Sequence, residues 1–379
     1  MPTVPRYSSG RRRCLTEVRP IRRVPQPGAL EAGRRLRLAR LAGGLTQSEL
    51  AELCGVSRQA VAGAEAGTWS PSLGVALLLA RALGTSVDQL FAAELEPRPV
   101  TAVSLGLEAR PGRARMALVW ERWVALPLTG DRTMVAGFGP ASGRLLERGE
   151  AQVWGSGRTI VVAGCDPALP LLGEHIAAAR EGWTMEWWAC SSQEALRLLD
   201  AGLVHAAAVH HARAAGTPPG VVRNQARIGF AGWREGVLRA DSGAAHARSL
   251  EEVLERRLRW VNRELGSEAR RLLDQELLRL GVENSSLAGY ASHASGHLQV
   301  ASAIASGAAQ VGIATEPAAL AYGLGFLPLA EEECVLHVER ERLETPELRL
   351  LLAALGGTSL GRELASLPGY ETAILGQEM

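Results

Sequence analysis

The sequence predicts a multidomain fold in which an α-helical domain is followed by an α/β domain. Residues 28–95 are dense in helix formers and predict a five-helix bundle, which ends at the proline-rich break Glu96–Pro99. Residues 96–157 are rich in glycine with short extended runs, and predict a linker or small β-rich segment. Over residues 158–379 short apolar runs alternate with helical segments, which is typical of a sheet with crossover helices.

The composition argues against several classes of protein. The 379 residues carry 41 lysines and arginines against 40 acids, a formal net charge of +1, so the chain is not generally polybasic. The five cysteines form no CxxC pair, which argues against a disulfide framework or structural zinc site and favours a reducing compartment. No signal-like run and no stretch of about 18 apolar residues occurs. We therefore expect a soluble, cytoplasmic protein with no membrane partner.

Residues 45–61 predict two helices joined by a tight turn. Thr46 and Glu49 form a capping box that begins the first helix. Gly55 stands where this helix must end, because only glycine reaches a left-handed conformation without steric cost. Ser57 then caps the second helix. The residues expected to face the core are Leu50, Ala51, Leu53 and Val61.

The flanking residues predict further helices over 30–42 and 73–83, and a capping box formed by Ser86 and Gln89 before a fifth helix. The order of five helices, with the motifs TQxELA, GVSRQ, ExG, PS and ALG-SVDQLF in register, resembles the DNA-binding domain of the XRE (lambda repressor/Cro-like) family. The resemblance covers about residues 30–92. It implies a helix-turn-helix that binds operator DNA as a dimer.

By this resemblance the second motif helix lies in the major groove. Arg58 and Gln59 would reach base edges, Gln47 at a helix N-terminus would meet a phosphate, and Ser57 would touch the DNA backbone. Ala62 belongs to the same DNA-facing set, although a polar or larger residue is usual there. The alternative is a five-helix module that binds protein.

The N-terminal residues 1–27 form a basic, proline-containing segment with seven arginines and one acid. This segment is either a solvated tail or a flexible arm that contacts phosphates. The helix-turn-helix, together with four more arginines at 34, 35, 37 and 40, favours the arm.

The α/β domain is predicted to begin with a βαβαβ unit. Strands are expected at 159–163, 184–189 and 204–209. Asp166 can cap the first crossover helix with Pro167 at its first position, and Ser191 with Glu194 forms a capping box for the second. Both helix starts then lie at the carboxyl edge of one sheet, where open α/β sheets bind ligands, and their free N–H groups favour an anion.

Further strand ends carry polar residues as well. A strand over 260–263 precedes a helix over 269–280 that opens at Ser267, and a strand over 310–314 ends at a turn containing Thr315. Cys165 is either inert packing or a ligand contact, and Ser191 and Ser192 are either N-cap residues or ligand contacts. The candidate ligand-binding residues are Cys165, Asp166, Ser191, Ser192, Arg263, Ser267, Arg270 and Thr315.

No catalytic set or metal site is predicted. GxSxG, HExxH, GxxxxGK[ST] and GxGxxG motifs are absent from the appropriate contexts. His293 and His297 are four residues apart but have no acid at the metalloprotease spacing, so we interpret them as core or surface residues. His210 and His211 end a strand, so at most one of them faces the cleft.

Several blocks resemble the PBP-like domain of bacterial one-component regulators, which is related to periplasmic molybdate-binding proteins. They are AGCDPALPLLGEHIA, ALRLLDAGLVHAAAVH, WVNRELGSEARRLLD, HLQVASAIASGAAQVGIATEPAA and LASLPGY, within roughly residues 158–370. The resemblance implies two α/β lobes hinged by two chain crossings, with ligand in the cleft. The family's RxxGSGTR stands here at 263–270, with Glu268 and Ala269 in place of glycine and threonine.

Together the two resemblances imply a ligand-responsive transcriptional regulator that is not an enzyme. Its ligand would be molybdate, tungstate or a related molybdenum metabolite, with no other cofactor and a homodimer bound to double-stranded DNA. The alternative is a molybdenum-cofactor-related enzyme or metabolite-binding protein whose helix-turn-helix serves in protein interaction.

Overall fold

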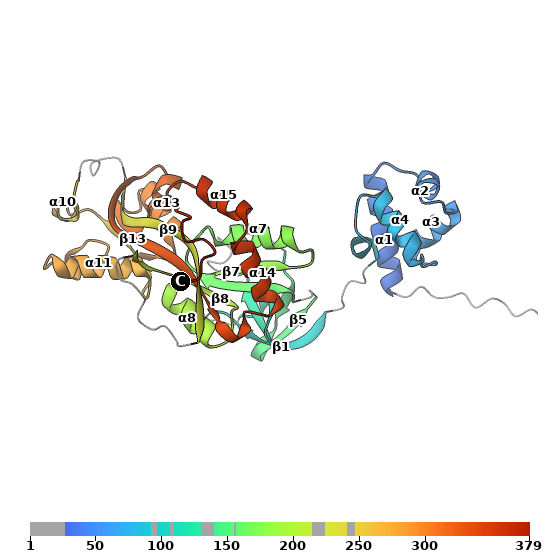
Figure 1. Cartoon of the computed structure of the whole chain (residues 1–379), viewed down its shortest axis with the longest axis horizontal. Helices are drawn as coiled ribbons and strands as arrows, with labels where there is room; N and C mark the ends of the chain where they lie inside the picture. Colours follow the sequence, from blue (N-terminus) through green and yellow to red (C-terminus); the bar gives the residue numbers. More distant parts are fainter. Residues whose placement is uncertain are drawn as a thin grey trace, which may run out of the picture. The chain divides into compact units, whose positions relative to one another are not determined.

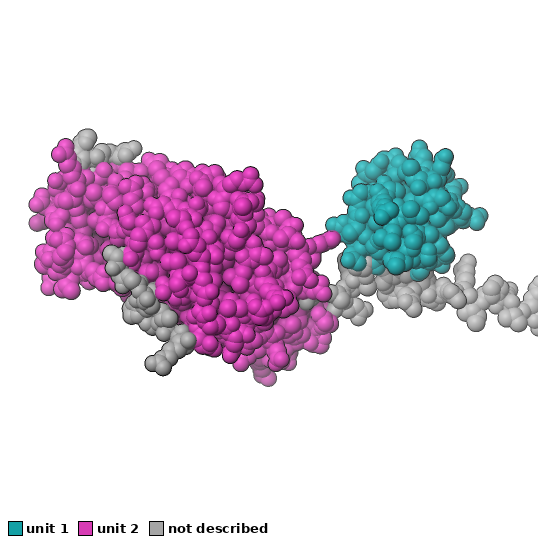
Figure 2. Space-filling model, viewed as in Figure 1, with its two compact units in different colours: residues 1–96 teal, residues 97–379 magenta. Residues whose placement is uncertain are grey.

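The computed structural model describes residues 27–91, 97–106, 110–129, 140–154, 157–213, 224–240 and 247–379. The arm predicted at 1–27 lies outside these residues apart from Pro27, which begins the first helix. The chain divides into two compact units, residues 1–96 and 97–379 (Figure 2). No helix within the described ranges combines the length and apolar character needed to cross a membrane.

The N-terminal unit is the predicted helical bundle, with five helices among its described residues (Figure 1). They are α1 (Pro27–Ala42), α2 (Gln47–Leu53), α3 (Arg58–Glu65), α4 (Leu73–Ala82) and α5 (Val87–Phe91). The capping box at Thr46 and the Ser57 cap are confirmed, since each side chain accepts a bond from the backbone N–H three residues later. The core includes Leu50, Ala51 and Val61, but the prediction for Leu53 is wrong, because this side chain is 62% exposed at the end of α2.

Two glycines fix the geometry of this bundle. Gly55 has a φ of +62° and ends the first motif helix as predicted. Gly33, in α1, lies against the C-terminal end of α3, where an added Cβ would stand 2.4 Å from the carbonyl oxygen of Glu65. A side chain at position 33 would therefore push α1 away from α3.

Five described strands between residues 98 and 153 form a small closed β-barrel at the start of the second unit. Its strands, in the order β1-β3-β2-β4-β5, are β1 (Arg98–Ser104), β2 (Gly112–Val119), β3 (Arg122–Pro127), β4 (Gly143–Leu145) and β5 (Glu150–Val153), with a 3₁₀ turn, η1 (Glu147–Gly149). Side chains from β2 and β3, including Val119 and Val124, share one hydrophobic core with Val161 of the neighbouring sheet. The β-rich segment thus packs as part of the α/β unit.

The rest of this unit is built on an eight-stranded sheet, counted over the described residues, in the order β11-β10-β12-β9-β13-β8-β6-β7. The strands are β6 (Thr159–Gly164), β7 (Thr184–Ala189), β8 (Ala206–Ala212), β9 (Gln225–Arg239), β10 (Trp260–Arg263), β11 (His293–Ala294), β12 (Val311–Thr315) and β13 (Gly325–Glu339). The helices are α7 (Leu169–Ala179), α8 (Ser192–Asp200), α10 (Leu250–Glu255), α11 (Glu268–Arg279), α12 (His297–Ala305), α13 (Glu316–Ala321), α14 (Pro346–Leu355) and α15 (Thr358–Ser366), with 3₁₀ turns η3 (Asn284–Ser286) and η4 (Arg340–Arg342).

Helices cover both faces of each half of the sheet. Successive residues of a strand point to opposite faces. Ile160 and Val162 pack with α7, α14 and α15, whereas Val161 and Ala163 pack with α8 and the barrel. In the other half, one face packs with α10 and α11 and the opposite face with α12 and α13. The predicted fold class, a helical bundle followed by an α/β domain, is confirmed.

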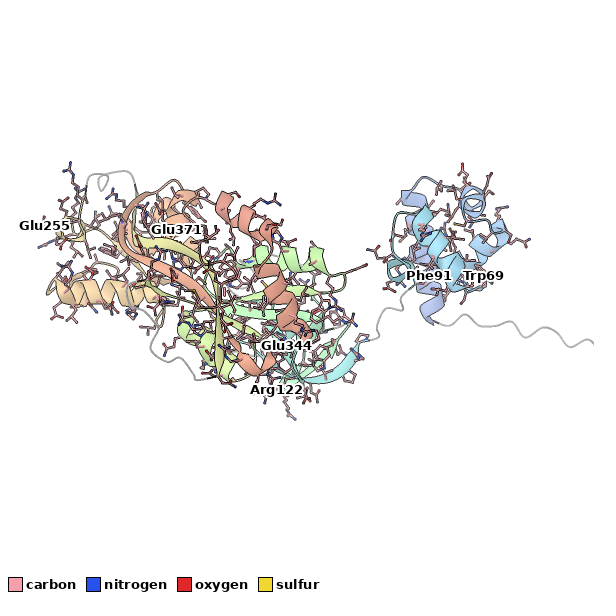
Figure 3. All side chains as sticks on the ribbon, viewed as in Figure 1. Trp69, Phe91, Arg122, Glu255, Glu344 and Glu371 are labelled. Carbon is pink, nitrogen blue, oxygen red and sulfur yellow. The ribbon has the colours of Figure 1, made fainter. Side chains whose placement is uncertain are left out.

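The two halves of the sheet are joined by β9 and β13, which pair antiparallel along their length. The parallel strands β6, β7 and β8 lie on one side of this pair, and β10, β11 and β12 lie on the other. The C-terminal segment runs beside β9, where Glu371 exchanges two backbone hydrogen bonds with Gly232 and binds Arg213 (Figure 3). Strands β9 and β13 thus correspond to the two chain crossings between lobes that the family resemblance implies.

One predicted helix start is wrong by two residues. The first crossover helix, α7, begins at Leu169 after Ala168 as N-cap, and Pro170 rather than Pro167 lies in its first turn. Asp166 stays outside the helix, and one of its carboxylate oxygens accepts a 2.7 Å bond from the N–H of Ala168. Asp166 therefore shapes the loop before the helix instead of capping it.

Candidate functional sites

The recognition-helix candidate, α3, presents its first turn to solvent. The Ser57 side chain accepts a bond from the N–H of Ala60, and Arg58 and Gln59 are exposed, while Ala62 is half-buried. Exposed arginine and glutamine side chains at a helix N-terminus are groups that can read guanine and adenine edges. The local structure therefore leaves these two side chains free to approach a groove.

Gln47 is held at the start of α2 by a network that links three helices. Its side-chain amide donates to Glu65 at 2.7 Å, and Arg40 of α1 also donates to Glu65 at 2.6 Å. Burial by itself raises the pKa of Glu65, but the bonds from Arg40 and Gln47 lower it overall. Arg40 is 7% exposed, so its side chain holds α1 to α3 instead of facing solvent. Gln47 and Arg58 line one surface hollow of about 430 Å³.

The α/β unit contains a cavity of about 610 Å³ at the carboxyl ends of β6 and β10. Its wall combines Cys165 and Trp187 from one half of the sheet with Arg263 and His297 from the other. Pockets of this size, with apolar walls and a few convergent polar groups, are typical of small-molecule sites. Of the eight residues predicted to contact ligand, Cys165 and Arg263 line this cavity.

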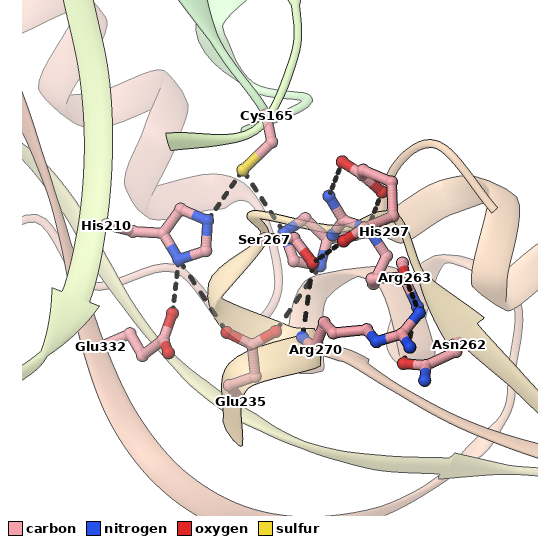
Figure 4. A network of polar contacts seen from close by, with 10 residues as sticks. Cys165, His210, Glu235, Asn262, Arg263, Ser267, Arg270, His297 and Glu332 are labelled. Atoms are coloured by element: carbon pink, nitrogen blue, oxygen red, sulfur yellow. Dashed lines mark hydrogen bonds and ion pairs between the residues drawn. The ribbon is translucent and has the colours of Figure 1, made fainter. Parts of the chain in front are cut away.

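Cys165 and His297 of this wall belong to a buried cluster of one sulfur and two imidazoles, which His210 completes (Figure 4). Cys165 follows β6, His210 lies in β8 and His297 begins α12. The Sγ atom of Cys165 lies 2.7 Å from Nε2 of His210 and 3.7 Å from Nε2 of His297. Three elements from both halves of the sheet therefore meet at this sulfur.

A carboxylate lies on the far side of each imidazole. Nδ1 of His210 is 2.6 Å from Glu332 of β13, and Nδ1 of His297 is 3.7 Å from Glu235 of β9. Burial raises the pKa of both carboxyl groups, that of Glu235 well above its ordinary value. Burial by itself lowers the pKa of His210, but Cys165 and Glu235 raise it to about 9, whereas burial lowers the pKa of His297 well below its usual range.

Arg263 is a buried cation beside this cluster, with 1% of its surface exposed. Its Nε and Nη2 atoms each donate to Glu264 at 2.8 Å, while Nη1 has no hydrogen-bond partner among the described residues. Burial by itself lowers the pKa of Arg263, but the bond to Glu264 raises it overall. Arg270 donates to the carbonyl oxygen of Arg263 and stacks over Tyr290, so it braces Arg263 from behind.

The predicted serines lie at helix starts beside the cavity and hold the backbone there. Ser191 accepts from the N–H of Glu194 at 3.3 Å, and Ser192 accepts from the N–H of His210 at 3.4 Å. Ser267 is the N-cap of α11. Ser192 thus joins the start of α8 to β8, and Ser267 joins the start of α11 to Glu264 directly after β10, whereas Ser191 caps α8.

Asp166 and Thr315 carry unpartnered buried oxygens. Asp166 Oδ1 accepts from the hydroxyl of Tyr370 at 2.8 Å, while its Oδ2 has no partner within the described ranges, and burial raises its pKa to about 6. The hydroxyl oxygen of Thr315, the N-cap of α13, is also buried without a partner in that part of the chain. These groups remain candidate polar contacts.

Sequence reasoning did not single out the histidine–carboxylate part of this site. The sequence pattern predicts a core or surface role for His297 and lets at most one of His210 and His211 face the cleft, and it marks neither Glu235 nor Glu332. Cys165, His210 and His297 are 45 and 87 residues apart in the sequence, so no local motif joins them. The one feature of the sequence that points to these three residues is their position. Each lies at a strand end or a helix start, and ligands of open α/β sheets bind at the carboxyl edge of the sheet.

Comparisons with known proteins match both units. A helix-turn-helix family model matches residues 36–90, and a PBP superfamily domain model matches residues 173–356. An uncharacterized HTH-type transcriptional regulator of Methanothermobacter thermautotrophicus is 58% identical over 49 residues, which are 13% of this chain and 71% of the relative.

Two bacterial relatives of unassigned function match longer segments. The uncharacterized protein YvgK of Bacillus subtilis is 34% identical over 120 residues, 32% of this chain and 38% of the relative. An uncharacterized protein from the 5′ region of the 2Fe-2S ferredoxin gene of Clostridium pasteurianum is 31% identical over 107 residues, 28% of this chain and 95% of the relative. The chain thus spans well under half of the length of YvgK.

Proposed function

Because the chain belongs to the XRE-type helix-turn-helix family and carries a PBP superfamily domain, we propose that it is a ligand-responsive transcriptional regulator. Residues 36–90 bind operator DNA, and the α/β unit binds a small molecule that changes the affinity for DNA. The regulator acts as a homodimer, so its operator contains two half-sites about 34 Å apart.

The exposed first turn of α3 supports the DNA-binding half of this proposal. Arg58 and Gln59 stand at its N-terminus, and Gln47 lies beside Arg58 at the start of α2. Arginine pairs with guanine and glutamine with adenine, while a helix N-terminus suits a phosphate. These residues, with Ser57 and Ala62, form the proposed DNA-facing surface.

The cavity beside Arg263 carries the ligand-binding half of the proposal. Burying an arginine to 1% exposure while its Nη1 NH₂ group has no hydrogen-bond partner among the described residues is costly unless a further partner reaches that group. We therefore place an anionic group of the ligand near Arg263 and Cys165. The other residues that contact the ligand or support this binding region are Asp166, Ser191, Ser192, Ser267, Arg270 and Thr315.

The ligand class remains molybdate, tungstate or a related molybdenum metabolite. A cavity of about 610 Å³ accommodates a molecule larger than a bare tetrahedral oxyanion, which favours the metabolite within this class. The apolar wall at Trp187 suits the organic part of such a molecule.

Calorimetric titration of the full chain with molybdate and tungstate, with sulfate as the control, tests the ligand. The full chain is required because the barrel shares a core with the sheet. Binding at 100 times the dissociation constant should stabilise the protein by about 2.7 kcal/mol, and Arg263→Ala should weaken it more than Ser267→Ala does. No heat with either anion, together with saturable binding of a neutral compound unaffected by both substitutions, would remove the anion from the proposal.

A further inference from the structure

The cluster around Cys165 has the donor set of a transition-metal site. The Sγ atom of Cys165 and one nitrogen each of His210 and His297 lie within 4.8 Å of one another, and all three residues are buried. Thiolate and imidazole are the ligands that zinc and copper prefer, whereas magnesium and calcium prefer oxygen. The chemistry of the donors thus selects a soft or borderline metal ion.

The orientation of the two imidazoles matches that donor set. Both histidines turn Nε2 toward the sulfur and Nδ1 toward a carboxylate, Glu332 for His210 and Glu235 for His297 (Figure 4). Histidines that bind metals commonly donate their second ring N–H to a carboxylate, which fixes the tautomer and the ring plane. The 2.6 Å contact of His210 with Glu332 fits this pattern, and Glu235 lies 3.7 Å from the second nitrogen of His297.

A cysteine nucleophile would explain less of this geometry. Such a nucleophile needs one histidine as base and one acid to orient it, which Cys165, His210 and Glu332 alone would provide. His297 and Glu235 would then have no role, although both oxygens of Glu235 and Nδ1 of His297 lack hydrogen-bond partners among the described residues. A metal ion bound by both histidines would give a role to both the His210–Glu332 pair and the His297–Glu235 pair.

We propose that Cys165, His210 and His297 bind a transition-metal ion of the zinc class, with an open coordination position toward the 610 Å³ cavity. Three protein ligands with a fourth position for an exogenous group is the arrangement of zinc sites that bind a small molecule. Cys165 and His297 both line the cavity, which supplies the route of entry. This site differs from the sequence-based expectation of no metal, and it does not depend on DNA binding.

Titration of the reduced full-length protein with Co²⁺ tests the site, because a bound thiolate gives sulfur-to-cobalt charge-transfer absorption. We expect one equivalent of Co²⁺ to produce this band and Zn²⁺ to displace it. Cys165→Ser should abolish the band, and His297→Gln should weaken binding at least tenfold. Cys54→Ala, which removes a thiol in the helical unit, is the control and should retain the band.

Glu332→Gln tests the carboxylate behind His210. This substitution should weaken Co²⁺ binding by about 10–100-fold while the band at saturation keeps its intensity, because the ligands themselves remain. Circular dichroism of each variant shows whether it is folded. Absence of the band in the folded wild-type protein, or its persistence in folded Cys165→Ser, would overturn the proposal.

Discussion

Arg58 and Gln59 occupy neighbouring positions in the first turn of α3, yet they should contribute differently to DNA binding. Gln59→Ala should weaken binding to the specific operator by about 1–3 kcal/mol and have little effect on random DNA, because an amide pair to adenine carries sequence information. Arg58→Ala should weaken both, since arginine meets bases and phosphates. Fluorescence anisotropy with the two DNAs measures the difference, and an equal effect of Gln59→Ala on both would contradict base reading.

His205 should make the α/β unit sensitive to acid. Burial lowers the pKa of His205 to about 3, and its Nδ1 accepts a 3.0 Å bond from the N–H of Val161. The unfolded chain binds a proton near pH 6.5 that the folded protein excludes, so stability is full above that pH and falls as pH drops toward 3. The fall is about 1.4 kcal/mol per pH unit within this window.

His205→Asn is the test of this effect, because an amide oxygen can still accept the bond from Val161 but does not titrate. Urea unfolding followed by tryptophan fluorescence should show a shallower fall in the free energy of unfolding between about pH 6 and 4. His337, whose pKa burial lowers to about 4, retains part of the slope. Identical slopes in the variant and the wild type would show that His205 is not the group that titrates.

The position of a residue at a strand end is the local signal in the sequence that points to the cavity. Arg263 and Cys165 stand at strand ends, and both line the cavity, although the sequence pattern alone leaves Cys165 open between inert packing and ligand contact. His210, Glu235 and Glu332 meet only through pairing among β8, β9 and β13, which no local pattern encodes. The buried polar cluster is a property of sheet order rather than of any segment.

Among the elements, the contact of α1 with α3 gives a sharp prediction. In Gly33→Ala, the new Cβ would stand 2.4 Å from a backbone oxygen of Glu65, which cannot move without shifting α3. We expect the stability of the helical unit to fall by about 1–3 kcal/mol. Amide hydrogen exchange over α1–α5 measures it.

Gly74→Ala is the matched control in the same unit. Gly74 lies in the first turn of α4 with no atom within 4 Å of an added Cβ. Alanine there should stabilise the unit by about 0.4–1 kcal/mol, because it reduces the freedom of the unfolded chain. A stabilising Gly33→Ala would contradict the tight crossing of α1 and α3.

The elements that local signals mark were predictable. The capping box at Thr46, the N-cap at Ser191 and the turn at Gly55 mark helix starts and ends, because these groups satisfy backbone atoms within a few residues. The start of α7 was misplaced because Pro167 and Pro170 both suit a first turn. The family resemblance implies two chain crossings between the lobes but does not say which residues form them. The sequences of β9 and β13 lack the apolar–polar alternation that marks a half-buried strand, so these two strands could not be located.

For the whole molecule, the basic segment before α1 should act through its charge. Deleting residues 1–26, which leaves α1 intact from Pro27, should weaken binding to all DNA sequences by a similar factor. Each DNA phosphate that is no longer neutralised should reduce the slope of log affinity against log salt by about 0.9. Anisotropy titrations at several salt concentrations measure this slope, and an unchanged slope would show that the segment does not bind phosphates.

The central claim is that one chain couples sequence-specific DNA binding to a ligand in the α/β cavity. The most direct measurement selects duplexes from a random library with the full chain and then measures the affinity for the enriched duplex with and without the anion that calorimetry shows to bind. We expect binding at least about 10³-fold tighter than to a scrambled duplex. The anion should change that affinity by about 5–150-fold, and Arg263→Ala should remove the change. Failure to enrich any duplex, or an affinity that the bound anion leaves unchanged, would contradict the account.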